Sequence, residues 1–552
     1  MINALLALTI AIASFFRLYK LTSLPISLFG DEIDVGYHAW SLITTGRDYM
    51  GNLLPTYIHS LSEWRAPLLM YITAPFVGIL GPTNLAVRLP VALLGIASVY
   101  LLFLLVKKMF NSSSIALVSA LALALTPWHI HYSRASFEVV PLLFLLLLGT
   151  LLFLKEKYFG SLIPFILTFY TYSTANVFTP LYILGLLIIT KPSLKLKQNW
   201  TRLIIPVIII FPMVINVLFG QAAGRFGLIS IFNDQKSIDQ LIIKRTESWI
   251  QPSTVETFFH NKYFSYATQF GKNYLTAFSP QFLFLQGDPF YRHSISEQGE
   301  LLWIFLPFFV YGLFFLLKSI KKDSMKIILL WLLLSPIPSS LTQGGATHAT
   351  RLFLMIPPLV IISAIGFVDI FSKVRYKKVV LLFSFVFLAL AFANYWHEYS
   401  AHYRVASARL WQYGYRDIFT QLEAVQPGAK NIYINNTYEP SLLKFAFFTQ
   451  YPPAKFQDDF RGDQQESFDN GMFRGFRFGD NYFFGQVGNL DDLAKLLQSG
   501  DIYLAAQLKE IPGDWDWTVD PPAGYKALGG TKDILGQPLF TIFTTSPSVI
   551  KL

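Results

Sequence analysis

The sequence predicts a polytopic α-helical membrane protein with a small α/β domain at its C-terminal end. Of its 552 residues, 53% are hydrophobic and only 14% are charged, whereas soluble domains carry about 25% charged residues. The apolar residues gather in runs such as 91–106, 141–154 and 203–218, which cross or nearly cross a hydrocarbon layer about 30 Å thick. From residue 396 onward, short strand-like and helical patterns replace these runs.

The first part of the chain, residues 1–395, is expected to form about eleven transmembrane helices. An additional apolar piece at 67–80 is too short to span comfortably, so we expect it to lie in the interface or to be re-entrant. The start of the chain lacks a basic leader and an obvious cleavage site, which favours a retained first helix. The expected spans are 2–18, 86–106, 115–130, 139–154, 160–173, 178–190, 203–219, 301–317, 327–340, 352–371 and 379–395.

Basic residues follow every second span, and by the positive-inside rule these loops are cytoplasmic. The opposite face then holds a first external loop at 21–66, a long external loop at 220–300, and everything after about residue 396. The pattern predicts a multi-pass protein of the plasma membrane whose C-terminal domain is extracytoplasmic. The basic loops are Lys107–Lys108, Lys155 with Lys157, 191–202, 318–326 and 373–378.

Residues 396–552 are expected to form the extracytoplasmic α/β domain. Strand-like pieces at 431–435, 501–505 and 538–543 alternate with helical patterns at 441–450 and 490–498. This part has 14 Lys and Arg against 18 Asp and Glu, whereas residues 1–395 have 30 against 16. The net charge of +10 therefore belongs to the membrane part, where it indicates topology and not a nucleic-acid partner. The absence of cysteine excludes disulfides and thiol nucleophiles.

Three carboxylates stand together in the first external loop, in the stretch FGDEIDVG at 29–36. Asp31, Glu32 and Asp34 could simply begin a helix, since acidic residues favour a helix N-terminus. Their place beside the membrane also suits chemistry, because cations occur in this loop and in the other expected external loops. These cations are Arg65, Arg134, Arg292 and Arg351.

Arginine side chains that converge could bind a phosphate bidentately. A carboxylate opposite them could deprotonate a hydroxyl that displaces a phosphate leaving group. Each arginine taken alone could equally anchor to lipid headgroups. The sequence therefore offers a catalytic interpretation and a structural one.

Five stretches resemble the GT-C membrane glycosyltransferases, in particular bacterial family 39, which is related to the protein O-mannosyltransferases and the lipid A aminoarabinose transferase. The likeness covers roughly residues 1–400, and its most specific element is the Asp-Glu pair after the first helix. The stretches are GDEIDVGY at 30–37, TGRD at 45–48, RLP at 88–90, PWHIHYSRASFE at 127–138 and YTYS at 170–173.

The resemblance implies a sugar donor on a polyprenyl phosphate, attacked at C1 by an acceptor hydroxyl with inversion. Asp31 becomes the candidate general base and Glu32 its acidic neighbour, with Asp34 as an alternative base. Arg134 and Arg351 become candidate phosphate ligands beside Arg65 and Arg292. Glu138, four residues after Arg134, could orient it or form a helix-surface ion pair. His131 and His348 lie next to these arginines in the sequence and are supporting candidates.

No metal is expected, although the acids could bind a divalent cation, since carboxylates suit magnesium or manganese. The acceptor is a protein, a lipid or a cell-wall polymer. The alternative from another class is a transporter or lipid flippase without transfer chemistry. Such proteins usually place charged or helix-breaking residues inside spans of two repeats, whereas here the charges gather in outer loops and no repeat is visible.

Overall fold

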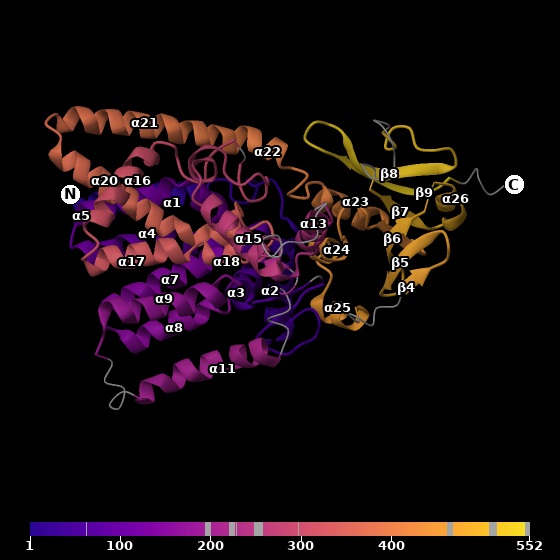
Figure 1. The fold of residues 1–552 in the computed structure, drawn as a ribbon. Coiled ribbons are helices and arrows are strands. Elements are labelled where there is room, and N and C mark those ends of the chain that lie inside the picture. Colours follow the sequence, from indigo (N-terminus) through magenta and orange to yellow (C-terminus); the bar gives the residue numbers. More distant parts are fainter. Residues whose placement is uncertain are drawn as a thin grey trace.

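The protein is a helical body joined to a C-terminal sheet domain (Figure 1). This computed structural model describes the chain apart from residues 62, 194–199, 220–226, 228, 248–257, 296, 461–466, 489, 507–509, 511–515 and 547–552. Parts of the expected long external loop at 220–300 therefore lie outside the described residues.

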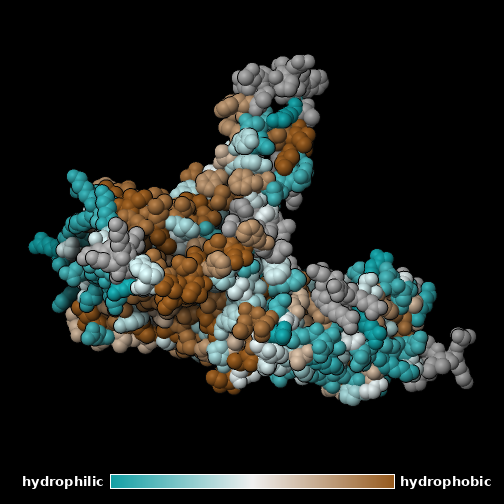
Figure 2. Space-filling model, turned by 90° about the horizontal axis from the view of Figure 1, so that it is seen from below, coloured by the Kyte–Doolittle hydropathy of each residue, from teal (hydrophilic) through white to brown (hydrophobic). Residues whose placement is uncertain are grey.

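A helix forms within each of the eleven expected spans. Within the part of the chain that the structure describes, three helical segments are long and apolar enough to cross a membrane, namely Asn84–Phe110, Ala349–Lys373 and Lys377–Ala406, and eight shorter apolar helices accompany them. Hydrophobic residues cover much of the helical body in Figure 2, with hydrophilic residues at its far end and over the C-terminal domain. The chain is a membrane protein, and the number of eleven spans stays a prediction. The helices are α1 (Ile2–Leu18), α4 (Asn84–Phe110), α5 (Ser113–Leu125), α7 (Val139–Leu154), α8 (Tyr158–Thr168), α9 (Ala175–Thr190), α11 (Ile204–Phe219), α16 (Phe305–Lys318), α17 (Asp323–Leu334), α20 (Ile356–Lys373) and α21 (Lys377–His397).

Glycine brings α16 and α20 into direct backbone contact. A Cβ atom at Gly312 would lie 2.0 Å from the carbonyl oxygen of Ile362, and one at Gly366 would lie 2.0 Å from that of Phe308. Small residues allow such close packing between membrane helices, where dispersion forces replace the hydrophobic effect.

Short elements at one end of the body build the loops around the site. Helix α2 (Gly30–Thr45) begins at the acidic stretch, and the hairpin β1 (Ile58–His59) and β2 (Trp64–Arg65) follows it. The apolar piece expected at 67–80 is helix α3 (Leu68–Leu80). The remaining short elements in these loops are α6 (Pro127–Tyr132), η3 (Ile231–Asn233), α13 (Gln235–Thr246), α15 (Lys262–Thr276), η4 (Gln281–Leu285), α18 (Ile337–Ser340), α19 (Ala349–Leu352) and η5 (Phe353–Met355), whereas η1 (Trp200–Leu203) leads directly into α11.

The C-terminal domain contains a mixed sheet in the order β4-β5-β6-β3-β7-β9-β8, within the described residues. The central strand β3 is parallel to β6 and β7, and the remaining pairs are antiparallel. Helix α21 continues through η6 (Glu398–His402) and α22 (Tyr403–Ala406), so the helical body extends past the expected boundary at 395/396. The domain elements are α23 (Tyr415–Val425), β3 (Ile432–Asn435), α24 (Leu442–Phe448), α25 (Pro453–Asp459), β4 (Ser467–Asp469), β5 (Phe473–Phe478), β6 (Tyr482–Val487), α26 (Leu490–Leu496), β7 (Ile502–Ala505), β8 (Tyr525–Lys532) and β9 (Pro538–Thr545).

Helix α2 shares a hydrophobic core with the C-terminal domain. Ile33 and Tyr37 of α2 are fully buried in one cluster with Phe447 and other side chains of the sheet domain. At Gly36, a Cβ atom would lie 2.7 Å from the ring of Phe447, so only glycine allows this approach. The Tyr37 hydroxyl donates to the carbonyl of Tyr451 at 2.7 Å. The acidic stretch at the start of α2 is therefore held between the helical body and the sheet domain.

Candidate active site

A cavity of about 560 Å³ lies where α2 and the β1–β2 hairpin face the C-terminal domain. Its wall includes charged side chains of both signs from both parts of the chain. The charged lining residues are Asp31, Asp34, Arg65, Arg292, Glu439 and Lys444. A concave site with a few converging polar groups is the usual place for a ligand.

The first two acids of the triplet point to different places, because successive residues on a helix are turned by about 100°. The Asp31 side chain is 52% exposed and lines the cavity. Glu32 is fully buried and accepts from Arg88 through Nε at 2.8 Å and Nη2 at 2.9 Å. Its Oε1 also accepts from the backbone N–H of Ser136 at 3.1 Å. Glu32 therefore fixes the helix start to α4 and does not face the cavity.

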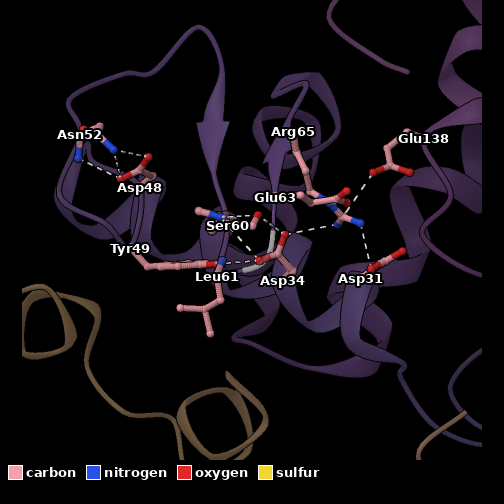
Figure 3. Close-up of polar contacts among 11 residues, drawn as sticks. Asp31, Asp34, Asp48, Tyr49, Asn52, Ser60, Leu61, Glu63, Arg65 and Glu138 are labelled. Atoms are coloured by element: carbon pink, nitrogen blue, oxygen red, sulfur yellow. Dashed lines mark hydrogen bonds and ion pairs between the residues drawn. The ribbon is translucent and has the colours of Figure 1, made fainter. Parts of the chain in front are cut away.

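Arg65 sits at the centre of a group of carboxylates (Figure 3). Its Nη2 lies 2.8 Å from Asp31, its Nη1 lies 3.3 Å from Asp34, and its Nε lies 3.0 Å from Glu63. Glu138 is 3.9 Å from Nη1. Burial opposes the charged form of Arg65, but the carboxylates outweigh it and raise its pKa well above the usual value. One cation thus holds Asp31 in place, and the cluster keeps an excess of negative charge.

Asp34 is buried and engaged on both carboxylate oxygens. Oδ1 accepts from the Tyr49 hydroxyl at 2.8 Å, and Oδ2 accepts from Ser60 Oγ at 2.7 Å, as Figure 3 shows. Burial raises the pKa of Asp34, and Arg65, Ser60 and Tyr49 counteract it. These contacts suit a residue that positions Arg65 and the hairpin. Asp31 is therefore the more exposed of the two acids in the cavity wall.

Two further cations line the cavity. The guanidinium of Arg292 lies 4.8 Å above the ring of Phe29, and its Nη2 donates to the carbonyl of Leu410 at 3.2 Å. Lys444 of α24 is 3% exposed, and its Nζ donates to the carbonyl of Pro440 at 2.6 Å. Burial lowers the pKa of Lys444 to about 8, with Glu439 opposing the shift. Sequence reasoning missed Lys444, although a lysine within the apolar run LLKFAFF is a detectable signal.

Arg134 does not reach the cavity, in contrast to the expectation that it binds phosphate. It is fully buried, and its guanidinium donates to the carbonyls of Phe16 and Tyr19 at 2.6 Å each and of Leu24 at 2.8 Å and 3.1 Å. Through these hydrogen bonds, Arg134 stabilises the end of α1. Glu138 lies 3.9 Å from Nη1 of Arg65 and so belongs to the group of carboxylates around that arginine.

Arg351, His131 and His348 also lie outside the cavity lining. Arg351 donates to Thr342 Oγ1 at 2.6 Å and to the carbonyl of Gln343 at 3.0 Å. His131 Nε2 donates to the carbonyl of Arg292 at 2.8 Å, so it supports a cavity residue through the backbone. His348 stacks on His293, with ring centroids 4.5 Å apart. The structure thus brings together Asp31, Asp34, Arg65 and Arg292 from the expected set.

Among the described residues, a group of side chains that could hold a metal ion is formed by Asp288, His293 and His348, and the acids of α2 are not part of it. Glu32 pairs with Arg88, whereas Asp31 and Asp34 both pair with Arg65.

Comparison with known proteins supports the resemblance noted in the sequence. Residues 64–217 match the family model described as dolichyl-phosphate-mannose-protein mannosyltransferase. The putative mannosyltransferase YycA of Bacillus subtilis is 32% identical over 141 residues, which cover 24% of this chain and 20% of that protein. The match therefore spans only a fifth of the relative's length.

One solved structure shares the fold across nearly the whole chain. ArnT from Cupriavidus metallidurans, bound to undecaprenyl phosphate, has a TM-score of 0.50 at 12% identity and covers 97% of each chain. The archaeal oligosaccharyltransferase AglB from Archaeoglobus fulgidus has a TM-score of 0.46 at 12% identity, covering 81% of this chain and 63% of that one. The fold is that of the GT-C membrane glycosyltransferases. Together with the family match, it confirms the predicted resemblance to the mannosyltransferase-like group.

Proposed function

We propose that the protein is an inverting glycosyltransferase that moves a sugar from a polyprenyl-phosphate carrier to an acceptor hydroxyl on the outer face of the plasma membrane. The observation that carries the proposal is the cavity in which the half-exposed Asp31 faces Arg292 and Lys444. A carboxylate and two cations around one space match the needs of a hydroxyl nucleophile and a phosphate leaving group.

Asp31 accepts the proton of the acceptor hydroxyl as its oxygen attacks C1 of the sugar. The bond between C1 and the phosphate oxygen breaks, and the lipid phosphate leaves with the bonding electrons. Attack from the side opposite the phosphate inverts C1. Arg65 keeps the Asp31 carboxylate aimed into the cavity through its 2.8 Å ion pair.

Arg292 and Lys444 offset the negative charge that grows on the leaving phosphate. Arg292 comes from the loop before α16 and Lys444 from the sheet domain, so the phosphate site needs both parts of the chain. Arg65 is already paired with carboxylates, which makes it less available to the phosphate.

The shared cavity also supports the proposed topology. Loop 21–66 and the C-terminal domain together line it, which supports placing both on one side of the membrane. The positive-inside rule predicts that the basic loops lie on the other side, so we propose that the cavity is extracytoplasmic. The acceptor, whether protein, lipid or cell-wall polymer, enters from that side.

The test is sugar transfer by purified Asp31→Asn protein with a panel of polyprenyl-phosphate sugars. The amide keeps the size of the side chain but removes its basicity, so we expect transfer to fall by about 10²–10⁴-fold with folding retained. Asp323→Asn is a matched control, because Asp323 is also in the first turn of a helix and its side chain is 55% exposed. It should transfer at the parent rate.

The outcomes separate the alternatives. Transfer by Asp31→Asn close to the parent rate would show that the proposed base is wrong. If Asp34→Asn were the inactive variant instead, the enzyme class would stand and the base would move three residues along the chain. Parent protein that moves lipid-linked sugar across a vesicle membrane without forming product would favour the transporter.

A further inference from the structure

A group of metal-binding side chains lies beside the cavity and has no part in the mechanism above. Asp288, His293 and His348 each offer one ligand atom, and these atoms lie within 4.8 Å of one another. His293 Nδ1 is 3.0 Å from Asp288 Oδ2, and the two imidazole rings stack with centroids 4.5 Å apart. The group joins the loop after η4 to the loop before α19.

The aspartate of this group is already oriented by backbone donors. Asp288 is 4% exposed, its Oδ1 accepts from the N–H of Phe290 at 2.9 Å, and its Oδ2 accepts from the N–H of Ala349 at 2.9 Å. Carboxylate ligands of metal ions are usually fixed by hydrogen bonds of this kind. The bond from Ala349 ties the two loops together at the position where the ion would bind.

His348 carries a polar atom that hydrogen bonding leaves unused. Its Nδ1 is buried and has no hydrogen-bond partner in the part of the chain that the structure describes. A buried polar atom without a partner costs about 1–3 kcal/mol unless a ligand or water satisfies it. His348 also offers a ring nitrogen within 4.8 Å of the ligand atoms of Asp288 and His293, so a metal ion at this point would contact its imidazole directly.

We propose that Asp288, His293 and His348 bind a divalent transition-metal ion, with zinc favoured by the two imidazoles and one carboxylate. Two histidines and one carboxylate form a known three-ligand set for zinc, and the fourth position is left for water or another ligand. The ion would fasten the two loops and, through His293, hold the adjacent Arg292 at the cavity wall. This inference does not depend on the proposed sugar transfer.

The test measures the metal content of the full-length protein, purified in detergent through a tag without histidine and in buffers without chelator. Elemental analysis of the parent should find about one zinc ion per chain. Asp288→Asn and His348→Gln should each keep less than about a tenth of it, since loss of a ligand weakens binding strongly. Removing the ion from the parent with a chelator should lower its unfolding temperature, and added zinc should restore it.

A second histidine pair gives a matched control. His397 and His402 lie close together on the surface, with their Nε2 atoms 3.2 Å apart. The His402→Gln variant should keep the full zinc content. Zinc lost from His402→Gln but kept in Asp288→Asn and His348→Gln would overturn the proposal, as would a parent that holds no zinc after dialysis against it. If a variant fails to fold, chelation and reloading of the parent still decide, because an unchanged unfolding temperature would refute the site.

Discussion

Replacing Glu32 with glutamine separates a structural acid from a catalytic one. In the structure, Glu32 and Arg88 form a fully buried pair in which both arginine nitrogens Nε and Nη2 donate to the carboxylate. The change removes the negative charge and leaves the shape almost intact. We therefore expect Glu32→Gln to lower stability and to leave the turnover of folded protein within about tenfold of the parent.

The size of the effect follows from what remains around Arg88. Breaking a buried ion pair by removing one partner costs about 3–5 kcal/mol. Arg88 also donates to the backbone carbonyls of Leu21, Pro25 and Ser27, and these contacts survive the change. The side-chain oxygen of the glutamine can still accept one hydrogen bond from Arg88. We therefore expect the loss of stability to lie at the lower end of this range, about 3 kcal/mol. That corresponds to about a 150-fold shift of the unfolding equilibrium.

The assay is a double-mutant cycle with Glu32→Gln, Arg88→Gln and the double variant, each unfolded by denaturant in detergent. Each single variant leaves one buried charge without its partner, whereas the double variant leaves none. The double variant should therefore lose much less stability than the sum of the two single losses. Transfer is measured per folded molecule, so that loss of protein is not mistaken for loss of chemistry.

One pattern would refute this reasoning. If Glu32→Gln unfolds like the parent while its transfer falls a hundredfold or more, Glu32 acts on a substrate. The structural role that we assign to Glu32, as the partner of Arg88, would then be wrong. Additive losses in the cycle would likewise show that Glu32 and Arg88 do not stabilise the fold as a pair.

Two other predictions concern the donor site and the topology. Because the pKa of Lys444 is about 8, its charge is present below that pH and lost above it, so the apparent KM for the lipid donor should rise between pH 7 and pH 9. Lys444→Gln should raise this KM at pH 7 and remove most of the pH dependence, and an unchanged profile would exclude Lys444 from donor binding. Reporter fusions after Lys322 should be cytoplasmic and those after Gly345 external. An external signal at Lys322 would overturn the loop assignment.

The sequence was sufficient for the helical body and for most of the elements that it predicted in the tail. Apolar runs and their lengths are local properties, and a helix lies in each expected span. The pieces expected at 431–435, 501–505 and 538–543 are strands β3, β7 and β9. The sequence pattern did not predict the strands β4 to β6 and β8, since aromatic and glycine-rich segments do not alternate cleanly between polar and apolar residues.

The site was predictable only in part, because burial and direction are tertiary properties. Asp31 and Glu32 look equivalent in the sequence. In the structure, the Asp31 side chain is half exposed, whereas Glu32 is buried in an ion pair with Arg88. The sequence predicts external loops for both Arg134 and Arg292, but backbone carbonyls at the end of α1 engage only Arg134. Whether an arginine can reach the cavity depends on contacts with chain segments more than a hundred residues away. A local sequence pattern does not predict such contacts.

The hydrogen bond between Tyr37 and Tyr451 has a consequence for how the protein is made. These residues are 414 positions apart, and ribosomes add about 5–20 residues per second. Helix α2 is therefore released roughly 20–80 s before the segment that covers it has been synthesised. During that interval the side chains of the C-terminal domain that later help to bury Ile33 have not yet been made. The cavity is therefore incomplete until the C-terminal domain has been synthesised, and a nascent chain stalled before that point would present an unfinished site to chaperones.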